Sequence, residues 1–554
     1  MDTSRVLIAI VLSLGLVFAY QELVLKRMYP THPEHEARAP GAPSETATPG
    51  TRPGAPAAVA GAPAVTTLAP PPSTAPERLI EVKTDLFRAV FTSDGARLKS
   101  FQLLRYRETA APNSPPYEMI RPASGGIFPL AAVIQTDDHT ASDRGLVYTT
   151  DAPAKVELKG SQRATLTFTA QTGTGMRLVK TFVVSGSSYL IDMTVSASGG
   201  SAPIKAVGVS MTQPMTERTD GYYDIPEIQA DVGSKVVADA QSALKKGFQA
   251  MTGEITYAGF GDRYFLAVFL PETPTYGVLS SRLSGNDATA ELLFPNASTL
   301  RTRVFLGPKA LEVLDAISPK LHEAINFGWF GFLSLPFLRV LKLFHDFTPN
   351  WGWDIILLTL AVRMLMLPMS IKGMRSMMKM QRLAPQMEKI RAQFKDEPER
   401  MQREMVDLYK RNHVNPLGGC APMLIQFPIF IALYEALLNA VELRHAPFIW
   451  WIRDLSAPDC YPVSWMPRIP YMHCHGIPVL VLLMGISTFV QQWMTPSSPD
   501  PNQQKMMMLM PVVFTVILVN FPAGLSLYYF ASNILGIIQQ VFLNREFRQT
   551  APAT

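Results

Sequence analysis

Long apolar stretches in the second half of the chain limit the possible folds more than any other feature. A run of about 20 apolar residues is the length that crosses a bilayer as a helix. Five such runs follow one another, at about 351–371, 417–441, 477–493, 505–521 and 523–543. Hydrophobic residues make up 47% of the 554 and charged residues 17%, and the apolar excess gathers in these runs. A multi-pass α-helical membrane protein is therefore expected, and a soluble enzyme is disfavoured.

Another apolar run, residues 6–20, follows Arg5, and apolar residues resume at 23–25 to bring the segment to about 20 residues. A cleaved signal peptide and an uncleaved anchor both fit such a segment. The residues at the end of this run, 18–23, read FAYQEL and lack a small-x-small cleavage pattern. Residues 1–29 are therefore predicted to be an N-terminal transmembrane anchor with its N-terminus inside. Residues 30–76 are a Pro/Ala-rich linker that cannot bury enough surface to order itself.

Residues 77–325 have short alternating segments separated by turn residues such as Ser93-Asp94-Gly95. Strand-like patterns occur at 79–83, 164–168 and 189–193. A large antiparallel β-sandwich domain is predicted, ending in a helix at about 308–325. Its acidic residues Asp220, Asp224 and Glu227 are interpreted as solvated surface. Residues 326–348 are aromatic-rich, interrupted by Pro336 and charged near their end, which predicts an interfacial amphipathic helix.

Charges between the apolar runs set the orientation, because cytoplasmic loops are enriched in Lys and Arg. Residues 372–415 carry eleven Lys and Arg against six acids. Arg545 lies just before the short tail at 547–554, and Arg548 lies within it. Six transmembrane helices, five of them a core at 349–546, then place both termini in the cytoplasm and the β domain in the periplasm. The net charge of +5 is too small to argue for nucleic acid.

Residues 372–415 have helical period and are predicted to form a cytoplasmic helical hairpin broken near Pro398. Methionines recur on its first arm, among them Met377, Met380 and Met387. They fit packing between the two arms, and their number also suggests a soft surface that accepts varied apolar segments.

Arg363 is the most informative single residue, because it lies well inside the predicted span at 351–371. A central arginine costs about 2.5–3.5 kcal/mol on insertion scales, so it should face protein or water. One interpretation is a structural ion pair with Glu435, the obvious acid in the next span. The other is a polar, water-filled cavity.

The depths of Arg363 and Glu435 below the cytoplasmic membrane surface distinguish the two interpretations. Eight residues separate Arg363 from the cytoplasmic end of its span, and eighteen separate Glu435 from its own, so they lie about 12 and about 27 Å deep. This difference of about 15 Å is too large for an ion pair and favours the cavity. Other polar residues are expected near the depth of Arg363, namely Thr359, Gln426, Thr515, Ser532 and Asn533.

The sequence resembles the YidC/Oxa/Albino family of membrane protein insertases, in its Gram-negative form with a large periplasmic domain. The resemblance covers about 327–545 and rests on residues 414–420, VNPLGGC, and 422–430, PMLIQFPIF. Thr359, Arg363 and Pro368, the pair Met510-Pro511, and FPAGLSLYY at 521–529 support it. It implies a lipid-exposed hydrophilic groove with Arg363 as its arginine, lined also by Tyr528 and Tyr529.

The resemblance further implies capture of the polar tails of nascent membrane proteins in the inner membrane, without a nucleotide or other cofactor. The implied partners are the Sec translocon, the lipid bilayer and, transiently, the ribosome and signal recognition pathway. The chain shows no P-loop, GxSxG or HExxH motif, so no enzyme activity is expected. A membrane-anchored periplasmic ligand-binding sensor or scaffold is the alternative, and a sugar-active domain is a weaker one. The tail lacks a long basic extension, which puts a ribosome-docking arm in doubt.

Three cysteines exclude a Cys₄ metal site. Cys460 and Cys474 fall in one predicted periplasmic loop, an oxidising compartment, and a disulfide between them is expected. Metal binding is the alternative because His473 and His475 flank Cys474. That spacing matches no common zinc pattern, so no metal site is predicted.

Overall fold

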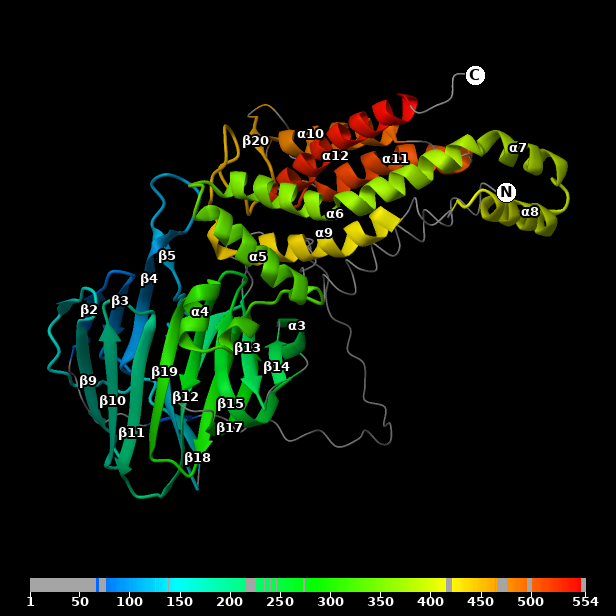
Figure 1. Cartoon of the computed structure of the whole chain (residues 1–554). Coiled ribbons are helices and arrows are strands. Elements are labelled where there is room, and N and C mark those ends of the chain that lie inside the picture. The colour runs from blue at the N-terminus through cyan, green and yellow to red at the C-terminus, as the bar shows by residue number, and fades with distance from the viewer. Residues whose placement is uncertain are drawn as a thin grey trace, which may run out of the picture. The chain divides into compact units, whose positions relative to one another are not determined.

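The computed structural model (Figure 1) describes most of the chain after residue 65. The described residues are 66–68, 76–124, 126–137, 139–215, 226–233, 235–239, 241–245, 247–272, 275–414, 421–463, 465, 472, 476–495 and 501–549. They form two compact units that divide between Ala324 and Ile325, with Thr109–Pro112 counted in the second. The predicted anchor and nearly all of the linker lie outside the described residues.

A fourteen-stranded sheet dominates the first unit. In spatial order its strands are β1 (Thr66–Thr67), β7 (Thr140–Ser142), β6 (Ala131–Thr136), β12 (Ile204–Pro214), β18 (Asp287–Pro295), β17 (Thr275–Ser284), β15 (Gln249–Gly261), β16 (Phe265–Pro271), β19 (Thr299–Pro308), β11 (Leu190–Gly199), β10 (Met176–Ser185) and β9 (Arg163–Gln171), with β13 (Glu227–Val232) beside β15 and β14 (Lys235–Asp239) beside β13. The five-stranded sheet has the order β5 (Pro116–Glu118), β4 (Arg97–Arg107), β3 (Phe87–Thr92), β2 (Leu79–Lys83) and β8 (Lys155–Glu157). The short helices are α3 (Gln241–Leu244), α4 (Leu311–Ile317) and the 3₁₀ turn η2 (Leu321–Ala324).

Burial along the strands explains their sequences. In β10 every second residue is buried, which is the pattern of a strand with one face on the core. All seven residues of β16 are buried, because β16 lies in the middle of the sheet with both faces covered. The predicted strand at 79–83 is β2, and the other two predicted strands fall on β9 and β11. The predicted turn follows β3, where Gly95 has φ +68°, a conformation that favours glycine.

The expectation of a purely antiparallel domain was wrong at two places. β1 pairs with β7 and β2 pairs with β8 in parallel. Neither pair is consecutive in the chain, and a parallel pair needs the long crossover that such a separation provides. The helix expected at 308–325 is also divided, because β19 continues to Pro308 and the remainder forms α4 and η2.

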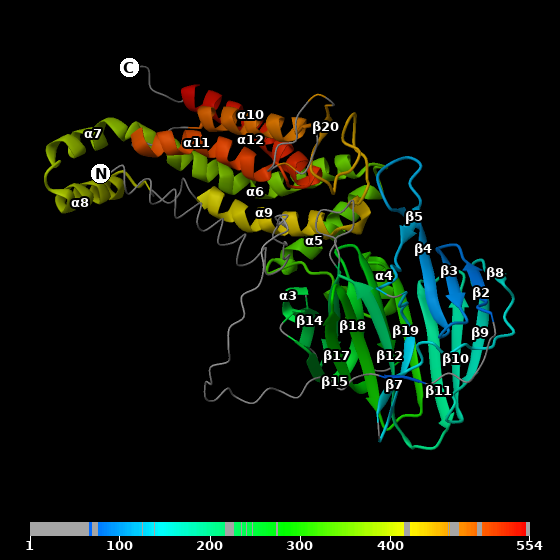
Figure 2. The same ribbon diagram turned by 180° about the vertical axis from the view of Figure 1, so that it is seen from behind.

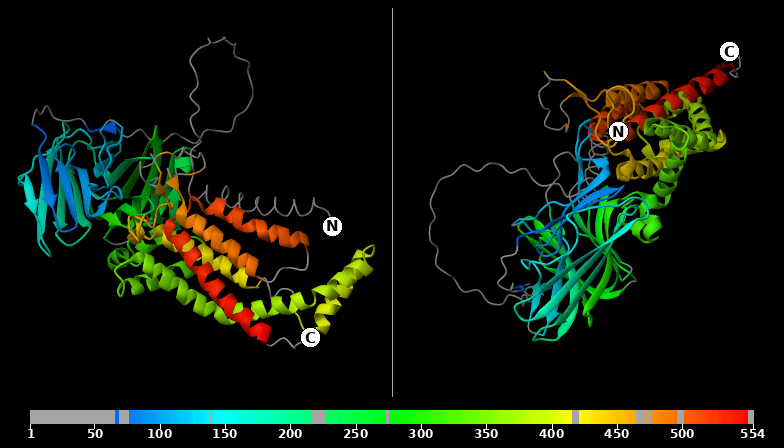
Figure 3. Two further views of the ribbon diagram at one scale, coloured as in Figure 1. Left: turned by 90° about the horizontal axis from the view of Figure 1, so that it is seen from above. Right: turned by 90° about the vertical axis from the view of Figure 1, so that its left-hand side faces the viewer.

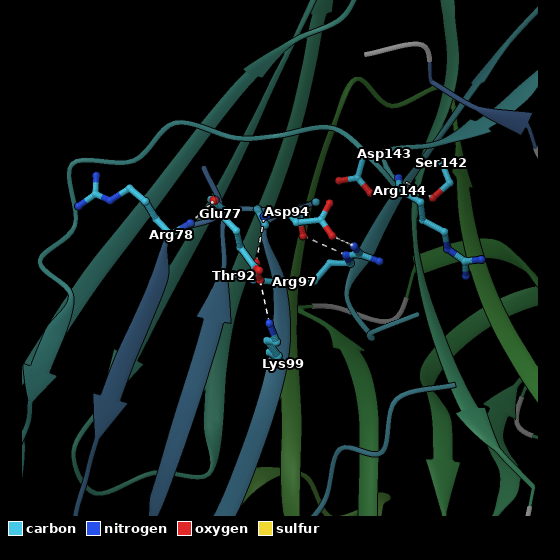
Figure 4. A network of polar contacts seen from close by, with 12 residues as sticks. Glu77, Arg78, Thr92, Asp94, Arg97, Lys99, Ser142, Asp143 and Arg144 are labelled. Carbon is cyan, nitrogen blue, oxygen red and sulfur yellow. Dashed lines mark hydrogen bonds and ion pairs between the residues drawn. The ribbon is translucent and has the colours of Figure 1, made fainter. Parts of the chain in front are cut away.

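Two polar groups lie within the first unit (Figure 4). Glu77 accepts hydrogen bonds from Thr92 at 2.7 Å and Lys99 at 2.9 Å, and these, Thr92 first, lower its pKa. Asp143 is fully buried and pairs with the equally buried Lys180 at 2.6 Å. Burial lowers the pKa of Lys180, while Asp143 acts in the opposite direction.

The second unit is mainly helical (Figure 2). Its elements are α5 (Gly331–His345), α6 (Trp351–Arg382), α7 (Ala384–Gln393), α8 (Pro398–Arg411), α9 (Ala421–Asn439), η4 (Val441–Leu443), β20 (Tyr461–Pro462), β21 (Gly476–Ile477), α10 (Val479–Met494), α11 (Pro501–Leu518) and α12 (Ala523–Gln549). α6 contacts α5, α9 and α12, and α10 contacts α11 and α12. The helix expected within 326–348 is α5, which continues through Pro336.

Apolar side chains face outward on these helices while polar side chains are buried. Leu365, Ile486, Val512 and Phe542 are each more than half exposed, whereas Asp354, Glu435 and Gln540 are almost completely buried. That distribution suits a lipid environment rather than water. Within the described residues, α6 is the one helix long and apolar enough to pass a test for a bilayer span, and Val479–Met494 and Met508–Leu518 are shorter apolar helices.

The predicted first span and the start of the predicted hairpin belong to one continuous helix. α6 runs without a break through Pro368 and Lys372 to Arg382, so the start of the predicted hairpin is the end of this long helix. Residues 372–382 keep the helical period and contain no proline, and the one glycine, Gly373, weakens a helix without ending it, so the helix continues past Ile371. α7 and α8 follow, packed through a cluster in which Leu383, Met387 and Val414 are buried.

Candidate functional site

Arg363 projects from α6 and contacts α12; the two helices lie against each other (Figure 3). The side chain is half-buried, and its Nε donates a hydrogen bond of 2.9 Å to the Ser532 hydroxyl. Among the residues that the structure describes, no carboxylate lies within ion-pair distance of it. The cation therefore has a neutral partner, as the sequence argument expects.

Two tyrosines extend this polar group. Tyr528 is buried on α12 one turn before Ser532, and its hydroxyl accepts a 2.9 Å hydrogen bond from the Gln426 amide on α9. The ring of Tyr529 packs edge-on against that of Phe430, with 6.0 Å between the ring centroids. It lies nearly parallel to the Phe514 ring, with 6.5 Å between the centroids. Both tyrosines interact electrostatically with Arg363. The structure thus brings four predicted site residues from α6, α9 and α12 into one group, namely Arg363, Gln426, Tyr528 and Ser532.

The remaining predicted groove residues make other contacts. The Thr359 hydroxyl donates to the Ile355 carbonyl at 2.6 Å, and the Thr515 hydroxyl to the Pro511 carbonyl at 2.7 Å. Each bond lies within the residue's own helix, an arrangement common for threonine. Thr359 is fully buried, and Thr515 packs where Gly485 leaves space on α10. Both hydroxyls therefore donate to backbone carbonyls of their own helices, and neither is hydrogen-bonded to Arg363.

Asn533 is buried between α12 and α10. Its amide donates to the Thr488 hydroxyl at 2.7 Å and to the Ser487 hydroxyl at 3.0 Å. It therefore fastens α12 to α10, one residue away from the serine that holds Arg363.

Glu435 lies apart from Arg363, in agreement with the depth argument. Its carboxylate accepts a 3.2 Å hydrogen bond from Asn439, which also donates to the Asn326 carbonyl at 2.9 Å. Gly328 has φ +61°, and a Cβ there would lie 3.3 Å from a Glu435 carboxylate oxygen. Glu435 and Asn439 on α9 thus hold the segment that precedes α5, a role that sequence reasoning left open.

Several residues near Arg363 were missed by the sequence analysis. Arg363 and Gln491 on α10 both approach Gly536 on α12, where a Cβ would lie 3.3 Å from a terminal nitrogen of Arg363 and 2.5 Å from the Gln491 amide nitrogen. Further along, Gln539 donates to Ser370 and Gln540 to Thr495. A signal was present, because residues four apart share one helix face and Tyr528, Ser532, Gly536 and Gln540 follow that spacing.

Met377 and Met380 are half-buried, and Met387 is buried in the cluster between α7 and α8. The Tyr409 hydroxyl lies 3.6 Å from the Met387 sulfur. For Met387, therefore, packing between the arms is the interpretation that the structure supports.

Cys460 is disulfide-bonded, while its expected partner Cys474 lies outside the described residues, as do His473 and His475. Asp459 beside it accepts hydrogen bonds from the Trp451 indole at 2.8 Å and from the Leu480 backbone at the start of α10. Burial raises the pKa of Asp459, and these hydrogen bonds oppose that shift. This outer loop is consequently tied to the first turn of α10.

The geometry can bind an anion. A guanidinium has five N–H donors, and among the described residues Ser532 accepts from one of them. A half-buried cation without a carboxylate of its own attracts a negatively charged or strongly polar group from another molecule. The surrounding side chains carry neutral hydroxyl or amide groups, so they do not neutralise the positive charge that attracts such a group.

Comparisons with known proteins identify the family of the chain. Residues 79–340 match the family described as the YidC periplasmic domain, and residues 343–550 match the family described as 60Kd inner membrane protein. A membrane protein insertase YidC of Geotalea daltonii is 36% identical over 479 residues, covering 84% of this chain and 87% of that protein. Its counterpart in Geotalea uraniireducens is 34% identical over 555 residues, covering 98% and 99%.

A solved structure described as an active YidC insertase with its first transmembrane domain resolved covers 86% of this chain and 94% of its own, at 18% identity and a TM-score of 0.36. The two family matches together account for nearly all of the chain from residue 79 to residue 550. The curated relatives match over both units at more than 30% identity. The chain therefore belongs to the YidC family of membrane protein insertases.

Proposed function

We propose that this chain captures the polar tails of nascent membrane proteins in a hydrophilic groove, open to cytoplasm and lipid, and aids their insertion, folding and assembly. The observation that carries the proposal is Arg363, a half-buried cation whose hydrogen-bond partner is the neutral Ser532. The outward apolar surface of the helices around it supports a place within the bilayer.

The physical role of such a site is to lower the cost of moving a polar segment into the membrane. A carboxylate entering hydrocarbon alone loses its hydration, which costs several kcal/mol. Near a fixed guanidinium and several hydroxyl and amide groups, part of this loss is offset by charge-assisted hydrogen bonds. The capture is reversible, since nothing covalent forms, and it needs no cofactor, nucleotide or enzymatic step.

The proposed topology has six membrane-spanning helices, both termini in the cytoplasm and the β-rich unit in the periplasm. Its support is the concentration of Lys and Arg in residues 372–415 and near the C-terminus. The helices α7 and α8 then form a cytoplasmic hairpin that meets clients first. The Sec translocon, the ribosome and the signal recognition pathway are the proposed partners, with no direct contact to nucleic acid.

The alternative, a periplasmic ligand-binding sensor or scaffold, places function in the β-rich unit. Deleting the folded β domain while keeping the anchor and residues 325–554 separates the two. An insertase keeps most of its activity after the deletion, whereas a sensor or scaffold loses all of it.

Substitutions at Arg363 test the electrostatic part of the proposal. Arg363→Lys keeps the positive charge and should retain much of the insertion of a client with an acidic translocated tail, while Arg363→Ala should lose it. Protease protection of the tail in reconstituted vesicles measures this. Equal behaviour of the alanine and lysine variants with that client would contradict electrostatic capture.

A further inference from the structure

Three neighbouring strands of the fourteen-stranded sheet, β12, β18 and β17, share one polar face. Cross-strand neighbours lie on the same face of a sheet, and so do residues two apart in a strand. The register places two rows of side chains there, Ser210–Glu291–Ser280 and Thr212–Thr289–Arg282. All six are polar, whereas the alternate residues of β12, such as Val209 and Met211, are apolar and buried.

Arg144 reaches this face from the loop after β7 and points away from Asp143 (Figure 4). Its terminal nitrogen donates to the Thr212 hydroxyl at 2.9 Å, and the Thr212 and Thr289 hydroxyls are 3.0 Å apart. Arg282 lies on the other side of Thr289, so two half-buried arginines flank a pair of threonines. Within the described residues, the buried Nε of Arg144 has no hydrogen-bond acceptor.

Glu291 lies two residues from Thr289 on the same face and is 6% exposed. Across the described part of the chain, no hydrogen bond reaches its carboxylate, and neither arginine lies within ion-pair distance of it. Burial raises the pKa of Glu291, and Arg282 and Arg144 oppose that rise. A buried carboxylate is costly unless donors complete it, and a bound molecule can supply them.

The surroundings of Arg144 are positive. Burial lowers the pKa of its guanidinium, and the next effects in the same direction come from Arg282 and Arg97. Two acids act in the opposite direction and contribute less. The other acid on this face of β18, Asp287, accepts a 2.8 Å hydrogen bond from the Ser124 backbone. Near Arg144 and Arg282, therefore, an anion is favoured over a cation.

A carboxylate that carries neighbouring hydroxyl groups fits this set of side chains. Its oxygens accept hydrogen bonds from the guanidiniums, including the free Nε of Arg144, and such charge-assisted bonds are among the strong ones. A hydroxyl of the same molecule donates to Glu291, and further hydroxyls exchange hydrogen bonds with Ser210 and Ser280. A simple anion such as acetate would leave Glu291 without a donor.

We propose that this face of the β-rich unit binds a sugar acid or a similar polyhydroxyl carboxylate. Arg144 and Arg282 hold its carboxylate, and Glu291 accepts from one of its hydroxyls and so distinguishes it from simple anions. All of these residues belong to the first unit, whereas Arg363 belongs to the second. The inference therefore goes beyond the insertion of membrane proteins.

Equilibrium dialysis of the full chain tests the proposal, in a detergent without a sugar headgroup. The probe is radiolabelled glucuronate. Glucose and acetate are the competitors, because glucose lacks the charge and acetate lacks the hydroxyls. Arg282→Gln should weaken glucuronate binding about tenfold or more, the size of a lost charge-assisted hydrogen bond. The matched control is Arg301→Gln on β19, an exposed arginine of the same sheet, which should stay within about twofold.

Glu291→Gln tests the second part of the site, because it keeps the shape of the side chain and removes its charge. An amide oxygen is a weaker acceptor than a carboxylate, and it does not repel an anion. Acetate should therefore compete better, and the preference for glucuronate over acetate should fall about fivefold. Circular dichroism of each variant checks that the fold is kept.

Four results would overturn the site. These are no binding of glucuronate, competition by glucose or acetate equal to that of unlabelled glucuronate, and equal effects of Arg282→Gln and Arg301→Gln. The fourth is displacement by short-chain phosphatidylglycerol at lower concentration than by glucuronate, which would assign these side chains to a lipid headgroup. Insertion of a client with an acidic tail should be unchanged in Arg282→Gln, so failure of this site leaves the proposed function untouched.

Discussion

Replacing the buried Lys180 should strongly destabilise the β-rich unit. Its ammonium group donates to Asp143 at 2.6 Å and to the carbonyls of Gly95 and Leu130 at 2.7 and 2.8 Å, and it is fully buried. Lys180→Met removes all three bonds and leaves the Asp143 carboxylate buried with an uncompensated charge. Removing one partner of such a pair typically costs about 3–5 kcal/mol.

Asp143 would keep two hydrogen bonds, from the Tyr148 hydroxyl at 2.8 Å and the Ala132 backbone at 2.9 Å. Those bonds hold it in place without neutralising it. Lys180→Met combined with Asp143→Asn should therefore recover part of the loss, because the isolated charge is gone. The matched control is Lys205→Met, which breaks a pair with Asp137 in which both side chains are more than half exposed and which should cost about 0–1 kcal/mol.

Hydrogen exchange of peptides from β10 in the full chain measures this prediction. A loss of 3–5 kcal/mol raises exchange through global opening by about 150- to 5,000-fold. The reasoning is refuted if Lys180→Met exchanges no faster than Lys205→Met, or if adding Asp143→Asn makes the loss larger.

Three further predictions concern other parts of the chain. Burial lowers the pKa of Lys309 from 10.5 to about 8, so the folded protein releases this proton before the unfolded chain does, and stability should rise by about 3 kcal/mol from about pH 8 to about pH 10.5. Lys309→Met should abolish that rise in urea unfolding followed by circular dichroism. Thiol labelling of denatured protein should find one reactive cysteine before reduction and three after it if Cys460 and Cys474 are bridged; three in both states would exclude the bridge. A photocrosslinker at Met377 should trap a nascent client earlier than one at Gln426, and the opposite order would remove the hairpin from the entry path.

The sequence was sufficient to predict features that depend on neighbouring residues in the chain or on depth along the helix axis alone. Helical rise alone separated Arg363 from Glu435, and the structure gives each a different set of partners. Alternation alone located β2, because a strand with one buried face repeats every two residues. The pairing of Cys460 was likewise expected from the compartment that its loop should occupy.

Other features depend on neighbours that no local pattern reveals. Thr359 lies one turn from Arg363 on the same helix, yet its hydroxyl donates to the Ile355 carbonyl. A side chain as short as that of threonine reaches the carbonyl one turn earlier in its own helix before it reaches another helix. Asn533 follows Ser532 directly, but adjacent helix positions face about 100° apart, so it contacts α10 instead of Arg363.

Composition, period and charge by themselves predicted the class of this protein and the order of its parts, and they singled out one half-buried arginine, Arg363. The tertiary structure alone decided which polar groups meet that arginine. Gln491 lies on α10, more than 120 residues after Arg363 in the chain. Gly536 contributes by lacking a Cβ, which would collide with the Gln491 side chain. Packing brings these three residues together, and the Arg363 and Gln491 side chains can approach α12 this closely because α12 carries no Cβ at Gly536.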